Sequence, residues 1–268
     1  MKASRVLPSI FVLLAFFGSA SIADGADDAA TMLDPSTSSD SIFGTAWGMT
    51  LALDGSGFYN DVLQAVLDNA ETEKNYKPLP YRRAKVEFFL REHSCLYPTE
   101  VGFLIQSGEI DNPEDYIQTV PLIWVESHLF SRYELGPLAS FDDLKGARIA
   151  YPNGSALPSV LDRYGPSFVP TTSETAKARM LIAGRVDHMS GSLPDNLFVF
   201  RAMGRKLPPY NPDLALARVG VSVVCHATPE NQAFVAAFDE SVAGLYGSGA
   251  MQALFEAAGV DLRFLPHP

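Results

Sequence analysis

Apolar residues recur at helical spacing in several segments of the chain and predict its helices. The clearest example follows Thr228, which suits an N-cap, and Pro229, which suits the first helical position. One face of this helix carries the apolar residues Phe234, Val235, Phe238, Val242 and Leu245. The Gly247-Ser248-Gly249 break ends it. Further helices are predicted over residues 61–70, 81–91, 174–183 and 251–258.

Short apolar runs lie between these helical segments. They predict strands at residues 43–53, 95–97, 123–131, 147–151, 186–190 and 219–225. Residues 71–77 are expected to form a polar connection. Strands that alternate with helices indicate an α/β fold, and the sequence shows no internal repeat.

The N-terminal segment has the features of an export signal. Lys2 and Arg5 precede a short apolar run at residues 10–17, which is followed by small residues. This order predicts a signal peptide over residues 1–23, with an N-terminal anchor helix as the alternative. Residues 24–41 are small, polar and acidic and are expected to be a flexible lead-in. No cysteine lies near the cleavage region, so we expect a periplasmic protein that is not a lipoprotein and does not insert into the membrane after cleavage.

Charge and motif content exclude several classes of function. The chain has 20 basic and 31 acidic residues, a net charge of −11, which argues against nucleic acid or an anionic membrane as a partner. The five histidines lack metal-ligand spacing, and no hydrolase elbow, Walker or dinucleotide motif is present. We therefore expect a protein that is not an enzyme and binds no metal and no cofactor.

Residues 140–155 predict a short helix, a strand and a tight turn that opens another helix. Ser140 can cap the short helix, Asp142 and Asp143 lie in its first turn, and Gly146 can end it. The strand leads into Asn153-Gly154-Ser155, whose backbone N–H groups would point at whatever lies beyond the sheet. Such a turn suits an anionic group.

The sequence SFDDLKGARIAYPNGS at 140–155, with MLIAGRVD at 180–187, resembles the second lobe of bacterial extracellular solute-binding proteins of family 3, the amino-acid-type receptors of ABC transporters. GFYND at 57–61 and PYRRA at 80–84 resemble phrases of the first lobe. NQAFVAAFDESVAGLYGSG at 231–249 is similar to the closing helix of the family.

The resemblance implies a two-lobe periplasmic binding protein fold of type II. Each lobe would be a mixed sheet flanked by helices, and a two-strand hinge would join the lobes. Lobe 1 would comprise residues 42–130 and 219–268, and lobe 2 residues 131–218.

Two departures from the family concern the ligand. The family carries a T-x-x-R motif whose arginine pairs with the ligand α-carboxylate, but no arginine follows Thr99 at that spacing. The family also places an aspartate a few residues after the GRVD phrase to bind the α-ammonium. That place is held by Ser192, and the next carboxylate is Asp195. The resemblance therefore does not imply an ordinary α-amino acid as ligand.

The candidate ligand-binding residues lie at the expected ends of strands and starts of helices. They are Trp47, Tyr59, Tyr81, Arg82, Thr99, Asn153, Gly154, Ser155, Ser192 and Asp195. For Trp47 and Tyr81, stacking on a ligand and packing in the core are both open alternatives.

In the family topology, Cys95 would end a strand of the first lobe, and Cys225 would lie on the strand that returns to this lobe. The resemblance therefore places the two cysteines on neighbouring strands. A disulfide and a pair of buried thiols remain alternatives.

The resulting expectation is a monomeric periplasmic receptor that closes on a small polar, possibly anionic, molecule and delivers it to an ABC transporter permease. One alternative is an accessory or sensor partner of another periplasmic protein. Another alternative is a receptor scaffold repurposed as an enzyme, because some relatives of these receptors dehydrate small acids.

Overall fold

The computed structural model describes residues 40–46, 48–70, 72, 74–153 and 155–266. Residues 38–268 form one structural unit. The predicted signal peptide, most of the lead-in, Trp47 and Gly154 lie outside the described residues. Within the described residues, no helix has the length and apolar character needed to cross a bilayer.

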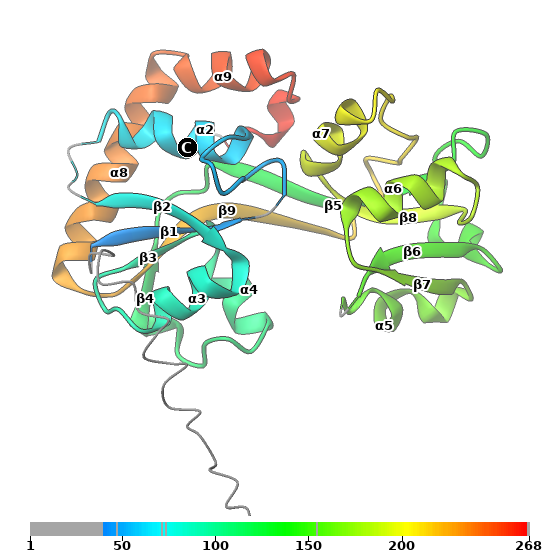
Figure 1. Cartoon of the computed structure of the whole chain (residues 1–268), viewed down its shortest axis with the longest axis horizontal. Coiled ribbons are helices and arrows are strands. Elements are labelled where there is room, and N and C mark those ends of the chain that lie inside the picture. The colour runs from blue at the N-terminus through cyan, green and yellow to red at the C-terminus, as the bar shows by residue number, and fades with distance from the viewer. Residues whose placement is uncertain (1–39, 47, 71, 73, 154, 267–268) are drawn as a thin grey trace, which may run out of the picture. The chain divides into compact units, whose positions relative to one another are not determined.

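The first group of elements surrounds a mixed sheet (Figure 1). Its strands are β1 (Ser41–Ala46), β2 (Asn75–Pro80), β3 (Cys95–Thr99), β4 (Tyr116–Gln118) and the C-terminal half of β9 (Ala217–His226). Its helices are α2 (Phe58–Leu67), α3 (Tyr81–Phe89), α4 (Val101–Gln106), α8 (Pro229–Gly247) and α9 (Ala250–Ala258). The strand order is β2-β1-β3-β9, and β4 also pairs with β9.

The second group surrounds another sheet. Its strands are β5 (Ile123–Ser131), β6 (Arg148–Pro152), β7 (Ser167–Thr171) and β8 (His188–Leu193), in the order β5-β8-β6-β7. Its helices are η2 (Phe141–Leu144), α5 (Leu157–Leu161), η3 (Asp162–Tyr164), α6 (Glu174–Ile182) and α7 (Asp195–Ala202). Ser140 caps η2 in a capping box with Asp143, as the sequence predicts.

Two long antiparallel strands connect the two sheets (Figure 1). The first half of β5 pairs with the first half of β9, from Ile123↔Val221 to Ser127↔Ala217. The rest of β5 pairs with β8, whereas the rest of β9 pairs with β3 and β4. The connection is therefore a two-stranded ribbon, in which β5 continues into the second sheet and β9 continues into the first.

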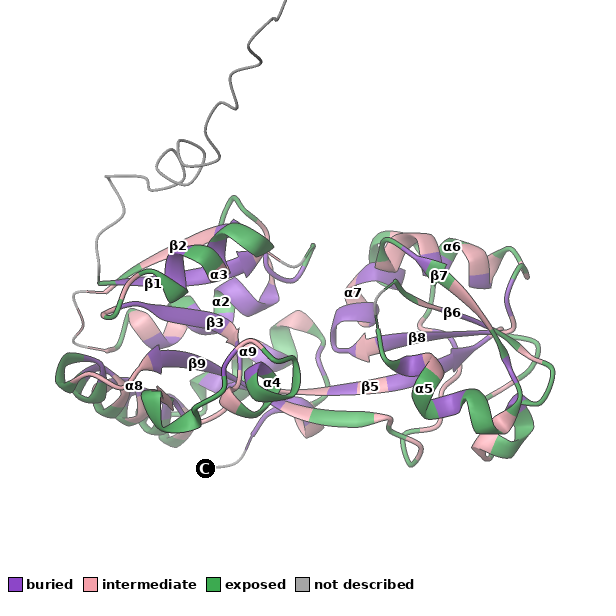
Figure 2. Cartoon of the chain, turned by 90° about the horizontal axis from the view of Figure 1, so that it is seen from below, coloured by how far each residue is buried: buried purple, intermediate pink, exposed green. Residues whose placement is uncertain are grey.

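Successive side chains along a strand point to opposite faces of the sheet, so each sheet has a buried core on both faces. In β1, Ile42 packs toward the α2 and α8 side, while the next residue, Phe43, packs toward α3 and α4; both are fully buried. In β6, Ile149 and Ala150 divide in the same way between the α5 side and the α6 side. The central strands are accordingly buried along most of their length (Figure 2), which fits sheets covered by helices on both faces.

Two local predictions were wrong. Residues 75–77 belong to strand β2 and not to a polar connection. The two prolines of β2 are tolerated because it is an edge strand that pairs only with β1. The first strand is also shorter than predicted, because β1 ends at Ala46 and residues 48–50 turn toward the start of α2.

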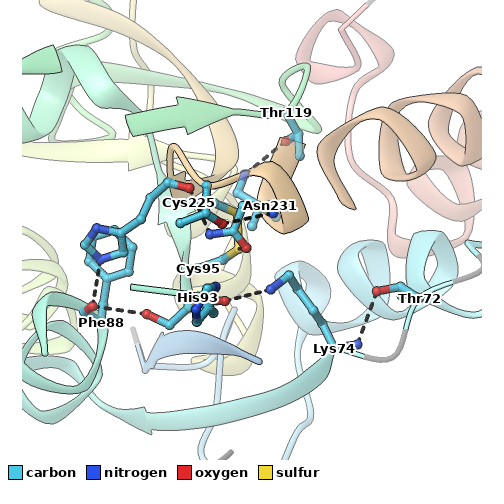
Figure 3. The surroundings of a disulfide bond; sticks show 12 residues. Thr72, Lys74, Phe88, His93, Cys95, Thr119, Cys225 and Asn231 are labelled. Atoms are coloured by element: carbon cyan, nitrogen blue, oxygen red, sulfur yellow. Dashed lines mark hydrogen bonds between the residues drawn. A yellow bond between two sulfur atoms is a disulfide. The ribbon is translucent and has the colours of Figure 1, made fainter. Parts of the chain in front are cut away.

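Cys95 on β3 and Cys225 on β9 form a disulfide (Figure 3). The two residues are direct cross-strand partners with Cα atoms 4.1 Å apart, and both are fully buried. Asn231 at the start of α8 lies beside the bridge and donates from its side-chain amide to the carbonyl of His226, at 2.8 Å. The disulfide therefore fastens the returning strand β9 to the first sheet within its core.

Candidate functional site

Two cavities adjoin each other where elements of both lobes meet, and we call the pair the cleft. The first cavity has a volume of about 270 Å³ and the second about 600 Å³. Both are lined by Tyr81 at the start of α3 and by Asp195 at the start of α7. The first cavity extends along the connecting strands, where it is lined by Val125, Ser127, Val219 and Val221. The second lies between the loop at 48–50 and the segment 171–175.

The structure brings six of the ten candidate residues to this cleft. Five line the first cavity: Tyr59, Tyr81, Thr99, Ser192 and Asp195. Asn153 lines the second cavity, together with Tyr81 and Asp195. Arg82 and Ser155 are exposed and line neither cavity. Trp47 and Gly154 lie outside the described residues.

Asp195 joins the two lobes through hydrogen bonds from first-lobe side chains. Thr50 Oγ1 donates to Asp195 Oδ1 at 2.7 Å, and the Tyr59 hydroxyl donates to Oδ2 at 3.1 Å. Asp195 is only 6% exposed. Each oxygen of this buried carboxylate thus accepts one hydrogen bond from the opposite lobe. A buried charge needs such hydrogen-bond partners.

A glycine allows the Thr50 loop to fold onto α2. Gly57 precedes the helix with φ of 111°, and a Cβ there would stand 2.5 Å from the carbonyl oxygen of Met49. The backbone N–H of Tyr59 donates to the carbonyl of Thr50 at 2.8 Å. Only glycine fits this conformation and this close approach, so Gly57 holds Thr50 and Tyr59 on the same side of the cleft.

Burial raises the pKa of Asp195 to about 6, although the hydrogen bonds from Thr50 and Tyr59 favour its ionised form. The neighbouring Glu174 adds to the upward shift. Burial also raises the pKa of Tyr59 well above its ordinary value, with Asp195 as a further cause. Tyr59 is therefore a neutral hydrogen-bond donor at physiological pH, and Asp195 is ionised at neutral pH at an energetic cost.

A buried lysine supports the second-lobe wall of the cleft. Lys177 is 1% exposed; its Nζ donates to the carbonyl of Ser190 at 2.7 Å and lies 2.6 Å from Glu174 Oε1. Asn196 donates from its amide to Glu174 Oε2 at 3.1 Å and to the carbonyl of Ser192 at 3.0 Å. These bonds fix α6, β8 and the start of α7 relative to one another.

Sequence reasoning missed several polar residues of the cleft, among them Thr50, Lys85 and Glu100. Lys85 is four residues after Tyr81 on α3 and hence on the same helix face, a signal that could have identified it. Its Nζ lies 4.4 Å from the centre of the Tyr81 ring and 2.6 Å from Glu109 Oε1. No comparable sequence signal marks Thr50, because its partner Asp195 is 145 positions away.

Within the described ranges, no group of three or more His, Cys, Asp or Glu side chains is arranged to hold a metal ion. The chemistry of the cleft is thus that of hydroxyls, carboxyls, aromatic rings and one paired lysine.

No family model matches the chain. No curated protein matches it. Solved structures do match, and they are two-lobe periplasmic binding proteins and related sensor domains. The glutamate complex of the GluR0 ligand-binding core from Nostoc punctiforme matches with a TM-score of 0.60 and 14% identity, covering 81% of this chain and 97% of that one. The unliganded, open L-cystine solute receptor of Neisseria gonorrhoeae has a TM-score of 0.62 and 16% identity, covering 81% and 90%.

A histidine kinase sensor domain with similarity to periplasmic binding proteins also matches, with a TM-score of 0.59 and 16% identity, covering 81% of this chain and 94% of that one. The chain shares the two-lobe fold of these proteins, which confirms the predicted fold class.

Proposed function

We propose that the protein is a divergent member of solute-binding protein family 3 and binds a small polar molecule in the cleft. One observation carries the proposal: two adjoining cavities are lined by side chains from both lobes and share Tyr81 and Asp195. Pockets of this kind, between two lobes and with a few polar groups in a largely apolar wall, are typical ligand sites. Structural neighbours that bind L-glutamate and L-cystine support a small-molecule ligand.

The proposed mechanism is hinge closure, with lobe 1 comprising residues 42–130 and 219–268 and lobe 2 residues 131–218. Because the paired strands β5 and β9 join the second sheet to the first, bending of this ribbon changes the distance between the cleft walls. A ligand that contacts both walls shifts the population toward the closed arrangement by its difference in affinity for the two states. The exported, periplasmic protein then delivers the molecule to a membrane transporter.

The sequence pattern suggested an anionic ligand, but we do not propose an anionic ligand for the cleft. Of the described residues of the turn that suggested it, Asn153 lines the second cavity and Ser155 lines neither. The helix that follows, α5, has five residues, too few for a strong helix-terminus site.

The test is a thermal-shift screen of the exported chain against amino acids, organic acids, amines and sugars, followed by calorimetry and small-angle scattering. A ligand at about 100 times its dissociation constant should stabilise the fold by about 2.7 kcal/mol. Tyr81→Ala should weaken binding of the hit. Tyr133→Ala is the matched control, because Tyr133 is similarly exposed and lies outside both cavities. A screen in which no compound stabilises the protein refutes the proposal.

A sensing role is the second candidate, because a histidine kinase sensor domain is among the structural neighbours. Deletion of the gene separates the two functions. Loss of uptake of the bound compound supports transport, whereas unchanged uptake with a lost transcriptional response supports sensing.

A further inference from the structure

The charged side chains of the cleft are mostly acidic. Among the described residues, the charged side chains that line the two cavities are Lys85, Glu100, Glu174 and Asp195. Among these residues no arginine lines either cavity. A ligand carboxylate would therefore meet three carboxyl groups and one lysine.

Two of these four charges are already compensated by the protein. Lys85 Nζ lies 2.6 Å from Glu109 Oε1 and faces the Tyr81 ring, so its charge is shared between a carboxylate and an aromatic face. Glu174 Oε1 lies 2.6 Å from the Nζ of the buried Lys177. Neither pair leaves a free cation for an anionic ligand.

Glu100 and Asp195 form no salt bridge among the described residues. Burial raises the pKa of Glu100, and a backbone hydrogen bond with Gly220 opposes this shift. The ionised form of Asp195 is favoured by hydrogen bonds from Thr50, Tyr59 and backbone, while Glu174 disfavours it. Lys177 also interacts electrostatically with Asp195, but its salt bridge is with Glu174. A carboxylate can accept about four hydrogen bonds, and the side chains of Thr50 and Tyr59 supply two, so Asp195 keeps acceptor capacity toward the cavity.

Beside the hydroxyl residues Thr45, Thr99, Ser127 and Ser192, much of the wall of the first cavity is aromatic and aliphatic. Tyr81 and Phe103 contribute rings, and Leu96, Val125, Val219 and Val221 contribute aliphatic side chains. Aromatic faces attract cations, and aliphatic walls favour an apolar ligand body. The carboxyls of Glu100 and Asp195 and this wall line the same cavity of about 270 Å³.

We propose that the ligand is an organic cation, a protonated amine or quaternary ammonium on a compact apolar body, and that it carries no carboxylate. The ammonium group lies between Glu100 and Asp195, and the apolar body packs on Tyr81 and the valines of β5 and β9. The inference rests on the proposed function, since it names the class of molecule that the same cleft receives.

The test compares molecules that share a body and differ in charge, at pH 7.5, which lies above the pKa of about 6 of Asp195. One series is 2-phenylethylamine, 2-phenylethanol, 3-phenylpropionate and L-phenylalanine; the other is butylamine, butanol and butyrate. Calorimetry should show that the amine of at least one series binds at least about tenfold tighter than its alcohol, since a charge-assisted hydrogen bond exceeds a neutral one by about this factor. The carboxylates and the amino acid should bind more weakly than the amine.

Glu100→Gln and Asp195→Asn should each weaken amine binding about tenfold and leave the alcohol unchanged. The alcohol distinguishes loss of charge from loss of structure. Glu134→Gln is the matched control, because Glu134 is exposed and lines neither cavity. If Asp195→Asn fails to fold, the wild-type series and Glu100→Gln still decide the question.

The inference is overturned if a carboxylate or alcohol binds as tightly as its amine, or if both variants bind the amine as the wild type does. It is also overturned, while the receptor function stands, if the broad screen yields only anions, sugars or amino acids as ligands. A broad screen without any ligand refutes the receptor function itself.

Discussion

The buried carboxyl of Asp195 should make the stability of the fold depend on pH in an unusual direction. Burial raises its pKa from 3.8 to about 6, so between these values the folded state holds a proton that the unfolded chain has released. The free energy of unfolding then falls as pH rises through this window. Asn at this position does not titrate, so the Asp195→Asn variant lacks this contribution.

The size of the effect follows from the two pKa values. A difference of about two pH units at 1.36 kcal/mol per unit gives about 3 kcal/mol. The unfolded carboxyl is already partly ionised at pH 4, so the advantage of the wild type over Asp195→Asn should shrink by about 2.4 kcal/mol between pH 4 and pH 7.5. The groups that face Asp195 are Thr50, Tyr59, Tyr97, Glu174 and Lys177, and they are common to both proteins.

The assay is urea unfolding followed by tryptophan fluorescence at several pH values for both proteins. Asp187→Asn is an informative control. Burial raises the pKa of Asp187, but the backbone N–H of Arg148 and the charges of Arg148 and Arg132 outweigh it and lower the pKa. For this residue the wild-type advantage should therefore be lost as pH falls, the opposite trend. A wild-type advantage over Asp195→Asn that changes by less than about 1 kcal/mol would show that Asp195 is not buried against Thr50 and Tyr59 in solution.

Three further substitutions test the packing around the connection. Replacing both cysteines with serine opens a link across 130 positions, and chain entropy predicts a loss of about 5 kcal/mol of unfolding free energy; an unchanged urea midpoint would contradict it. In Gly191→Ala the new Cβ would collide with the Asn196 amide, so urea unfolding should show a loss of about 1–3 kcal/mol, and a neutral effect would refute the close approach. Arg263→Met removes a 2.9 Å hydrogen bond from Nη2 to Glu126 Oε2 on β5 and should cost about 1 kcal/mol in the same assay, since the pair is partly exposed; equal stability would show that the pair contributes nothing.

Local signals predicted most elements of the fold well. Thr228 and Pro229 define the start of α8 as predicted, and β5 spans the predicted residues. The apolar runs and caps that mark these elements lie within the elements themselves. Strand β2 was missed because its sequence, NYKPLP, has two prolines and little alternation. What makes it a strand is its pairing with β1 at the sheet edge, which is a long-range property.

The site was less predictable than the fold, because its geometry depends on contacts between distant segments. Asp195 could be picked from the sequence as the carboxylate nearest to a family position, but its hydrogen bonds to Thr50 and Tyr59 span 145 and 136 positions. Arg82 was a candidate and Lys85 was not, although helix spacing places Lys85 on the same face as Tyr81. Charge type alone did not tell which of these cations faces the cleft.

In the proposed receptor, Asp195 serves both lobe contact and ligand contact, which links its ionisation to closure. The donors Thr50 and Tyr59 belong to the first lobe and the acceptor Asp195 to the second, so these bonds exist only when the lobes approach each other. The pKa of about 6 for Asp195 already includes the favourable effect of these hydrogen bonds. At neutral pH, ionisation of Asp195 therefore weakens the lobe contact by about 3 kcal/mol relative to the protonated form. A cation beside Asp195 lowers the cost without removing the bonds, and even a modest difference in affinity then shifts the closing equilibrium strongly.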